Sequence, residues 1–261
     1  MAMKTKTIIQ ARVGSTRLPH KVLLTIMNKP VLEYVIERGS CAKNIDGVII
    51  ATTTSEEDSP IVDIAAKLRI KMYRGSENDV LGRFYHAAKA FGAENIVRIT
   101  ADCPLIDPKI IDSVVDCYIK NKADYCSNVL EPTFPDGEDV EIFSFKTLLQ
   151  AWESAQLPSE REHVTSYIIK HPERFKVISV KNNLDLSAKR WTLDEKKDFQ
   201  FIKSILEALY PDNPMFTMED ILKFVSKNPD LENLNKDIQR NEGYQKSLKE
   251  DSRVKQGTQN D

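Results

Sequence analysis

Short β-branched segments alternate with amphipathic segments along the first 120 residues, and this alternation restricts the possible folds more than any other feature of the sequence. The strand-like segments are Thr5–Gln10, Gly47–Thr53, Ile70–Tyr73 and Asn95–Thr100, and the helix-like segments are Pro30–Cys41, Pro60–Leu68, Asp79–Phe91 and Pro108–Lys120. The run Gly47–Thr53 is almost continuously apolar, which is typical of a strand buried on both faces. The pattern predicts an α/β fold, with a mixed, mostly parallel sheet and helices on both faces.

The second half of the chain is less regular. Strands are predicted at Val140–Phe145 and Phe175–Val180, and helices at Thr147–Gln156, Glu160–Ile169, Phe199–Leu209 and from Thr217 onward. The spacing of Leu231, Leu234 and Ile238 is that of one further packed helix. Gly243–Asp261 is polar throughout and is expected to be frayed or disordered.

Composition excludes several classes of protein. With 37 Lys and Arg against 39 Asp and Glu, the chain lacks the positive charge of a general nucleic-acid coat protein. No apolar run approaches the roughly 18–20 residues that span a bilayer, and the first ten residues do not form a signal peptide. The four cysteines have no CxxC spacing, which indicates reduced thiols in a cytoplasmic protein.

The loop after the first strand combines small and cationic residues. In the segment 10–21, Ala11, Gly14, Ser15 and Thr16 accompany Arg12, Arg17 and Lys21. Small residues let backbone N–H groups approach phosphate oxygens, and the cations offset the negative charge, so the loop fits a polyphosphate. The order of residues matches neither GxxxxGK[ST] nor GxGxxG, and a solvated loop with no ligand is the alternative.

A lone aspartate, Asp102, follows the strand Asn95–Thr100. A carboxylate at this place is suited to Mg²⁺, which binds one or two carboxylates together with phosphate oxygens and water; a turn Asp that accepts local N–H groups is the alternative. Asp107, before Pro108, is expected to cap a helix. A second metal-binding carboxylate has five candidates, which are Asp136, Glu138, Asp139, Glu141 and Asp194.

The segment ARVGSTRLPHKVL resembles the opening signature of the cytidylyltransferases that make CMP-activated sugar acids, such as the acylneuraminate and 3-deoxy-manno-octulosonate (KDO) enzymes. RITADCPLID, PDGEDVEIF, REHVTSYI and RWTLDEKKDF are closest to the branch named for spore coat polysaccharide biosynthesis protein F. The resemblance runs from about Lys6 to Leu209 and implies the nucleotide-diphospho-sugar transferase fold, which is Rossmann-like and of the GT-A type.

The resemblance also assigns roles to individual residues. It implies that Arg12, Ser15, Arg17 and Lys21 line the CTP phosphates, with Ala11 and Gly14 in the same loop and with Arg74 and Asp79 near the nucleotide. Asp102 and Asp194 are the implied magnesium ligands, and Arg12, Lys21 and Asp102 the implied catalytic residues. Arg161 and His163 are directed to the sugar pocket, with a helix bearing ordinary solvated charges as the alternative.

The predicted activity is that of a nucleotidyltransferase. It transfers CMP from CTP to the anomeric hydroxyl of a sugar acid, with release of pyrophosphate, for surface polysaccharide or glycan biosynthesis. A glycosyltransferase of the same fold and a non-catalytic sugar-nucleotide binder are the alternatives; no DxD motif supports the former. Residues 1–230 are expected to form the enzyme domain, 132–176 a dimerisation or sugar-binding subregion of a homodimer, and 231–261 a polar, partly disordered extension.

Overall fold

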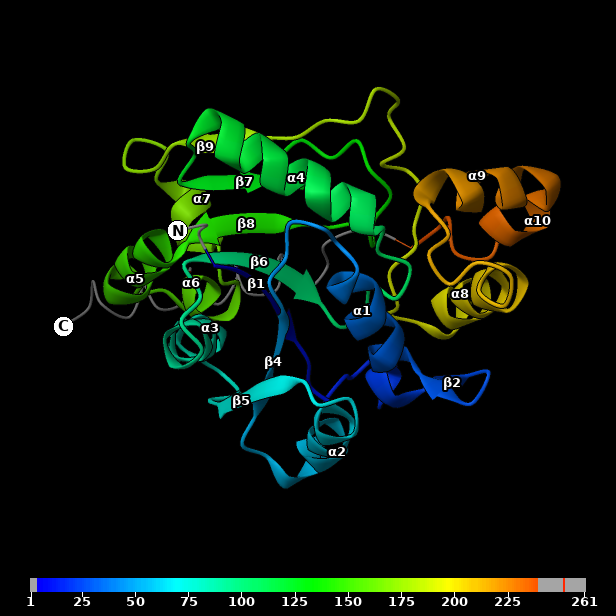
Figure 1. The fold of residues 1–261 in the computed structure, drawn as a ribbon. Coiled ribbons are helices and arrows are strands. Elements are labelled where there is room, and N and C mark those ends of the chain that lie inside the picture. Colours follow the sequence, from blue (N-terminus) through cyan, green and yellow to red (C-terminus); the bar gives the residue numbers. More distant parts are fainter. Residues whose placement is uncertain (1–3, 239–250, 252–261) are drawn as a thin grey trace.

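The computed structural model describes residues 4–238 and residue 251, which form a mixed α/β structure around a seven-stranded sheet (Figure 1). The strand order is β5-β4-β1-β6-β8-β7-β9, and only β8 among these strands runs antiparallel to its neighbours. The strands are β1 (Thr5–Gln10), β4 (Val48–Thr53), β5 (Lys71–Gly75), β6 (Asn95–Thr100), β7 (Tyr125–Ser127), β8 (Glu141–Ser144) and β9 (Val177–Ser179). The predicted fold class is confirmed.

Helices cover both faces of this sheet. They are α1 (Val31–Ser40), α2 (Ser59–Lys67), α3 (Val80–Ala90), α4 (Pro108–Asn121), α5 (Phe145–Ser154), α6 (Pro158–Glu162), α7 (Ser166–Lys170), α8 (Lys196–Leu209), α9 (Met218–Lys227) and α10 (Pro229–Glu232). Two 3₁₀ turns, η1 (Lys21–Leu23) and η2 (Glu56–Asp58), and a small hairpin, β2 (Thr25–Ile26) with β3 (Lys29–Pro30), complete the described elements.

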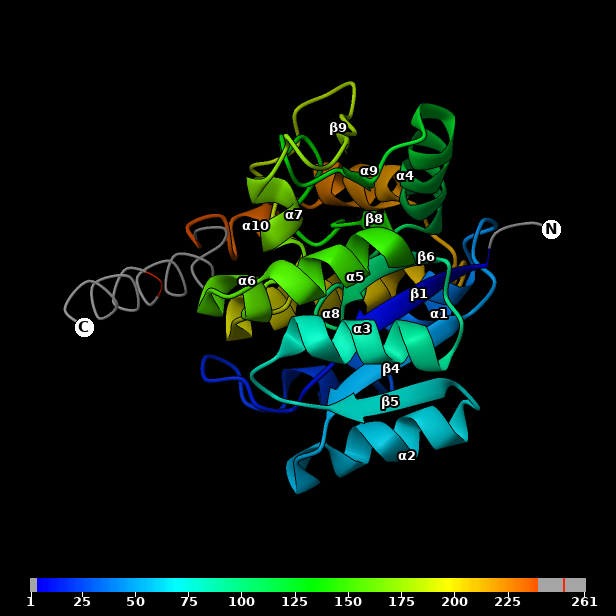
Figure 2. The same ribbon diagram turned by 90° about the vertical axis from the view of Figure 1, so that its left-hand side faces the viewer.

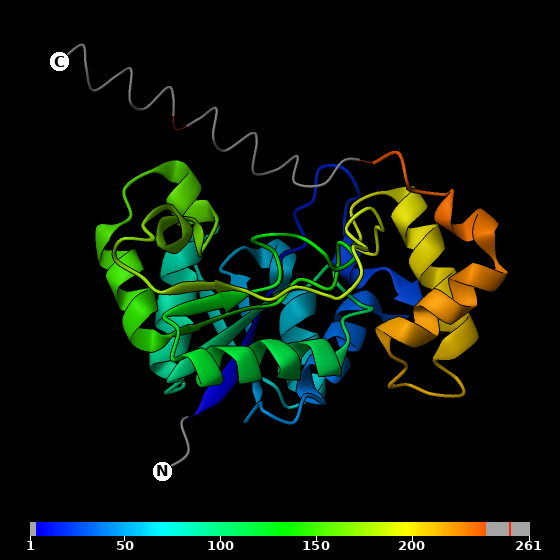
Figure 3. The ribbon, with the colours of Figure 1, turned by 90° about the horizontal axis from the view of Figure 1, so that it is seen from above.

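Successive strand residues enter two separate hydrophobic cores, because side chains alternate across a sheet. Ile9 and Ile50 pack in a core with residues of α1, α2, α4, α8 and α9. Their neighbours Ile8 and Ile49 pack in a second core with residues of α3, α5 and α7. Figure 2 shows α3 and α5 on the face turned to the viewer, and Figure 3 shows α8–α10 together at one end and α5–α7 at the other.

The predicted elements and the observed ones differ mainly in the second half. The single helix expected at Glu160–Ile169 is divided into α6 and α7, because the backbone of His163 is extended, with φ −104° and ψ 91°. The hydroxyl of Thr165, in the intervening turn, donates to the buried Glu141 at 2.6 Å. The short strand β7 and the hairpin β2–β3 were not predicted. The helix expected through Ile238 ends at Glu232, although Leu231 and Leu234 still pack against the core.

The C-terminal region is described only in part. The stretch predicted to be disordered, Gly243–Asp261, lies outside the described residues except for Asp251, whose carboxylate accepts hydrogen bonds from the backbone N–H and hydroxyl of Ser159 at 2.9 and 2.6 Å. Within residues 4–238 and 251, every helix is too short or too polar to cross a membrane.

Candidate active site

The strand order reverses direction at β1, and this reversal fixes where a ligand can bind. From β1 the chain continues to β4 and β5 on one side and then returns to β6 on the other side. Ligands of open α/β sheets bind at such a point, outside the carboxyl ends of the strands. Gln10 at the end of β1 is paired with Thr100 at the end of β6. The loops that follow these two strands therefore start side by side.

The loop after β1 is anchored by its apolar residues, which leaves its polar residues to line a cleft. Val13 and Leu18 are buried in the core. The backbone N–H of Val13 donates to Oδ1 of Asp58 at 2.6 Å, so the carboxylate at the end of η2 fixes the loop. His20, at a φ of 57°, adopts a left-handed conformation that starts η1 and brings Lys21 to the cleft.

The cleft has a volume of about 1070 Å³ and runs across the ends of β1 and β6, from the loop before α3 to α6. Eleven of the twelve residues predicted from the sequence line it, and Arg74 does not. The eleven are Ala11, Arg12, Gly14, Ser15, Arg17, Lys21, Asp79, Asp102, Arg161, His163 and Asp194. The fold thus brings together segments that are distant in the sequence.

Lys21 joins the two aspartates that were predicted to converge. Its Nζ atom lies 2.6 Å from Oδ2 of Asp102 and 2.8 Å from Oδ1 of Asp194. The backbone N–H of Leu193 donates to the carbonyl oxygen of Asp102 at 2.8 Å, which holds the segment before α8 against the end of β6. A second cation, Arg17, approaches Oδ2 of Asp194 at 2.9 Å. Both carboxylates therefore face the loop that follows β1.

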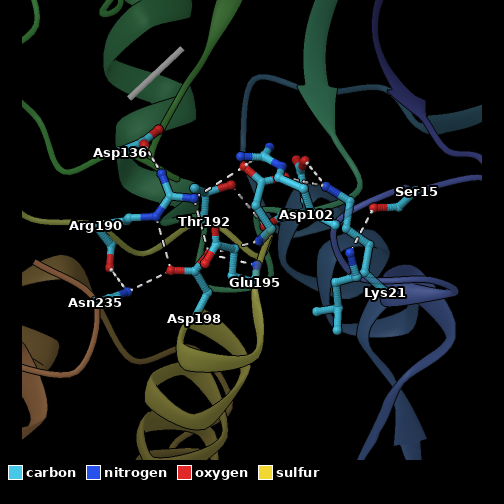
Figure 4. Close-up of polar contacts among 12 residues, drawn as sticks. Ser15, Lys21, Asp102, Asp136, Arg190, Thr192, Glu195, Asp198 and Asn235 are labelled. Atoms are coloured by element: carbon cyan, nitrogen blue, oxygen red, sulfur yellow. Dashed lines mark hydrogen bonds and ion pairs between the residues drawn. The ribbon is translucent and has the colours of Figure 1, made fainter. Parts of the chain in front are cut away.

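Arg190 contacts Oδ2 of Asp194, whereas Lys21 contacts Oδ1. Figure 4 shows Arg190 between Asp136 and Asp198. Its Nη2 atom lies 3.2 Å from Oδ2 of Asp194, and its Nε and Nη2 atoms each lie 3.0 Å from an oxygen of Asp198. Asp136 accepts from Nη1 of Arg190 at 2.9 Å, and Asn235 donates to Asp198 at 2.8 Å. This buried arginine pairs with carboxylates and so fixes the position of Asp194.

We call this group, Arg17, Lys21, Asp102, Arg190 and Asp194, the Lys21 cluster. Burial would raise the pKa of Asp102, but the attraction of the Lys21 ammonium outweighs burial and lowers the pKa to about 2. Burial would likewise lower the pKa of Lys21, but the two carboxylates raise it above its ordinary value. Lys21 and Asp102 are consequently charged at neutral pH.

The residues of the Lys21 cluster fit the predicted magnesium ion. Mg²⁺ binds through one or two carboxylates and completes its shell with phosphate oxygens and water. Asp102 and Asp194 supply two carboxylates that already converge on one cation, the Lys21 ammonium. No group of three or more metal-ligating side chains occurs among residues 4–238 and 251. The arrangement is therefore suited to a metal ion that arrives with a phosphorylated ligand.

Arg74 serves the loop after β4 instead of the cleft. Its Nε atom donates to the carbonyl oxygen of Thr53 at 2.8 Å, and its Nη2 atom donates to that of Ser55 at 2.7 Å. Its position after the predicted strand Ile70–Tyr73 resembles that of a nucleotide-binding residue, but in the structure Arg74 lies within β5. The side chain, however, is used to tie β5 to the end of β4.

The two predicted sugar-binding residues, Arg161 and His163, line the part of the cleft that is formed by α6. Nε of Arg161 is 3.6 Å from Oδ1 of Asp79, so α6 is tied to the N-terminus of α3. Asp79 caps α3 by accepting from the backbone N–H of Gly82 at 2.9 Å. Burial lowers the pKa of His163 below its ordinary value although Glu162 lies nearby. His163 is thus neutral at pH 7.

Arg83 in α3 lines the cleft and was missed in the sequence. It is buried, its Nη1 atom donates to the carbonyl oxygen of Ser76 at 2.6 Å, and its Nε atom has no hydrogen-bond partner among the described residues. Burial, with a contribution from nearby Arg12, lowers the pKa of Arg83 to about 10. The sequence did hold a signal for this residue: Arg83 is a cation among the apolar residues of the predicted helix Asp79–Phe91.

The acidic segment PDGEDVEIF does not contribute to the cleft lining. Asp136 pairs with Arg190, and Glu141 pairs with Arg98. Glu138 is buried and accepts from the backbone N–H of Asp107 at 2.8 Å. All five candidates for a second metal-binding carboxylate lie in the part of the chain that the structure describes, and of these five only Asp194 lines the cleft.

The sequence is similar to that of known proteins along most of its length. The sequence model of the cytidylyltransferase family matches residues 7–233. An uncharacterised protein of Methanocaldococcus jannaschii is 38% identical over 252 residues, which cover 95% of this chain and 99% of that protein. The spore coat polysaccharide biosynthesis protein SpsF of Bacillus subtilis is 30% identical over 231 residues, which cover 85% of this chain and 94% of that protein.

Solved structures show the same fold. A cytidylyltransferase from Leptospira borgpetersenii serovar Hardjo-bovis has a TM-score of 0.85 and 35% identity, covering 91% of this chain and 100% of its own. The CMP:2-keto-3-deoxy-manno-octonic acid synthetase complexed with CTP has a TM-score of 0.60 and 14% identity, covering 78% and 98%, and supports the fold alone. Because the family match extends over most of the chain and these relatives are matched along nearly their whole length, the chain belongs to the cytidylyltransferase family.

Proposed function

We propose that this cytidylyltransferase transfers CMP from CTP to the anomeric hydroxyl of a sugar acid and releases pyrophosphate, in the biosynthesis of a surface polysaccharide or glycan. The observation that carries the proposal is the contact of Lys21 with both Asp102 and Asp194 at the point where the strand order reverses. A protein of the same fold is complexed with CTP, and SpsF is named for polysaccharide biosynthesis.

The loop after β1 is assigned to the triphosphate. CTP carries about four negative charges, and Arg12, Arg17 and Lys21 present three cations along one wall of the cleft. Gly14 and Ser15 leave the backbone accessible between those cations. Arg can contact two phosphate oxygens at once, whereas Lys acts as a compact charge. These cations stabilise the charge that develops on the departing pyrophosphate.

Asp102 and Asp194 would hold the magnesium ion. When bound, the ion supplies charge neutralisation at the phosphates and lowers the pKa of a nearby hydroxyl. Arg190 and Arg17 keep the Asp194 carboxylate in place for this role. Lys21 contacts both carboxylates and also belongs to the phosphate-binding wall. Its ammonium group can therefore neutralise negative charge on the carboxylates or on the phosphates.

The reaction is a single displacement at phosphorus. The anomeric oxygen forms a bond to the α-phosphorus, and the bond from this phosphorus to the bridging oxygen breaks. Pyrophosphate leaves with the electron pair, and the hydroxyl proton passes to solvent. Arg161 and His163, at the end of the cleft formed by α6, are assigned to the sugar acid, where Arg161 provides a cation for its carboxylate.

A pyrophosphate-release screen tests the proposed function. Four nucleoside triphosphates are crossed with legionaminic, pseudaminic, neuraminic and octulosonic acids in the presence of Mg²⁺. We expect release with CTP and one or more of the acids. Release of a nucleoside diphosphate from a sugar nucleotide would instead identify a glycosyltransferase, and CTP binding without turnover across the panel would identify a binding protein.

Two further parts of the proposal concern the setting of the enzyme. We propose a homodimer in which residues 132–176 contribute to the interface, and light scattering at micromolar concentration measures the mass that decides this. We also propose a cytoplasmic location, which is supported by the supply of CTP there and by Cys41, Cys103, Cys117 and Cys126, all of which are free thiols.

A further inference from the structure

A group of buried polar side chains lies beneath the floor of the cleft, around Glu141 on β8. Glu141 faces Arg98 across the β6–β8 pair, and Nη1 of Arg98 donates to its Oε2. Its other oxygen, Oε1, accepts from the hydroxyl groups of Tyr125 and Thr165, each at 2.6 Å. We call these residues and Gln10 the Glu141 cluster. Arg98, Tyr125 and Thr165 thereby occupy both oxygens of the carboxylate.

Arg98 extends this cluster to the surface of the cleft through Gln10. Its Nε atom donates to Oε1 of Gln10 at 3.1 Å. A guanidinium group only donates hydrogen bonds, so the group of Gln10 that it contacts must be the carbonyl oxygen. The NH₂ group of Gln10 is consequently turned away from Arg98. Gln10 is half-buried and lines the cleft, and no described residue accepts a hydrogen bond from its NH₂ group.

We propose that the NH₂ group of Gln10 donates a hydrogen bond to an oxygen acceptor of a substrate, and that Arg98 holds the amide in the orientation required. This proposal rests on the proposed function and adds a specificity-determining residue to it. Gln10 ends β1 beside Thr100, two residues before Asp102, so its donor lies in the floor between the phosphate-binding wall and α6. Two substrate groups have the required chemistry: a pyrimidine carbonyl of CTP and the carboxylate of the acid.

The fixed orientation gives this donor its power to discriminate. A free glutamine amide can rotate to present either its oxygen or its NH₂ group, whereas Arg98 leaves only the NH₂ group for a ligand. Arg98 cannot rotate freely because Glu141 holds it from the buried side. A substrate that presents a donor at this position leaves two N–H groups facing each other, and buried groups left without a partner reduce affinity strongly.

The test replaces Gln10 by Glu, which has nearly the same shape and still accepts from Arg98 but has lost the donor. Gln200→Glu, at an exposed position of α8, is the control for the added charge. Calorimetry gives the Kd of CTP with Mg²⁺, and steady-state kinetics give the KM of the acid. We expect Gln10→Glu to raise one of the two constants by about tenfold or more, while Gln200→Glu changes neither by more than about twofold.

The constant that changes identifies the group that binds Gln10. An increase in the Kd of CTP assigns the pyrimidine carbonyl, and an increase in the KM of the acid assigns the carboxylate. In the second case, a carboxamide analogue of the acid should lose less affinity in Gln10→Glu, because its NH₂ group can donate to the new carboxylate. A lost packing contact alone would not produce this reversal.

Unchanged constants in a folded Gln10→Glu protein would overturn the inference and leave the proposed function standing. Failure of the parent protein to bind CTP or to release pyrophosphate with any acid would refute the proposed function instead. Gln10→Leu provides the second variant: it removes both groups of the amide, so it must also raise the constant that Gln10→Glu raises.

Discussion

The Lys21 cluster and the Glu141 cluster both contain ion pairs next to the same cleft, but they differ in exposure to solvent. The difference lies in the carboxylates: the side chains of Asp102 and Asp194 are 23 and 20% exposed and that of Glu141 is 5% exposed, while their partners Lys21 and Arg98 are 14 and 16% exposed. Glu141 accepts from donors on two strands and one turn, whereas Asp102 contacts Lys21 in the cleft.

This difference indicates which cluster can exchange partners. Charges that water can reach lose little when one partner is replaced by a ligand, while a buried pair loses several kcal/mol when either partner is removed. The Lys21 cluster is therefore suited to binding and releasing a metal and a polyphosphate. The Glu141 cluster is suited to a fixed role, which is to orient a neutral amide.

The largest expected effect is the loss of activity when residues of the Lys21 cluster are replaced. Lys21→Ala and Asp102→Asn should each lower the rate of pyrophosphate release by roughly 10³-fold, because each removes charge stabilisation from the transition state. Lys197→Ala, at an exposed position on α8, is the control and should retain the parent rate. A parent rate in either folded variant would remove Lys21 or Asp102 from the mechanism.

The Glu141 cluster should instead contribute to the free energy of unfolding. Glu141→Gln removes the buried carboxylate that pairs with Arg98, so we expect it to lower the free energy of unfolding by about 3–5 kcal/mol. Asp194→Asn, in the Lys21 cluster, should lower the free energy of unfolding by less, because water can reach its partners. Urea unfolding of both variants measures the difference. Equal losses of stability would remove the distinction between the two clusters.

Lys21 should compete with the metal ion in the absence of nucleotide. Its ammonium lies between the two carboxylates that would hold Mg²⁺, so Lys21→Ala should bind Mg²⁺ several-fold more tightly than the parent, even though it loses activity. Calorimetric titration of the nucleotide-free protein measures this. Weaker Mg²⁺ binding by Lys21→Ala would contradict competition for one position.

The smallest effect is expected in acid. The pKa of Asp102 is lowered from 3.8 to about 2 in the folded protein, so its ion pair contributes stability above pH 3.8 and loses that contribution as the pH falls toward 2. The difference in stability between the parent and Asp102→Asn should therefore shrink across this interval. Chemical unfolding at a series of pH values checks it, and a difference that is constant with pH would mean that this pKa is not lowered.

The sequence predicted the parts of the molecule that depend on local pattern and on strand ends. The regular alternation of strands and helices gave the parallel half of the sheet, and the polar residues after β1 and β6 gave the positions of Lys21 and Asp102. Asp194 was one of five candidate carboxylates, and the resemblance to the cytidylyltransferases selected it. The contact of Asp102 and Asp194 through Lys21 confirms that these segments lie together in one cleft.

The rest depends on pairings that a sequence does not display. The orientation of Gln10 follows from Arg98, whose own orientation follows from the insertion of β8 between β6 and β7. Arg74 has a position near a strand end like those of the lining residues, yet its side chain turns to two backbone carbonyl groups. The burial of Arg83 likewise depends on how α3 packs on the sheet.

The tie between Asn235 and the Arg190–Asp198 pair has a consequence for protein synthesis. Asn235 is buried and donates to Asp198 and to the carbonyl oxygen of Arg190, which in turn positions Asp194. A ribosome must therefore extrude the chain beyond residue 235 before the Arg190–Asp198 pair gains this contact. A nascent chain that stalls or is cleaved before this residue carries the loop after β1 and Asp194 but lacks the contact that holds the Arg190–Asp198 pair from the C-terminal side.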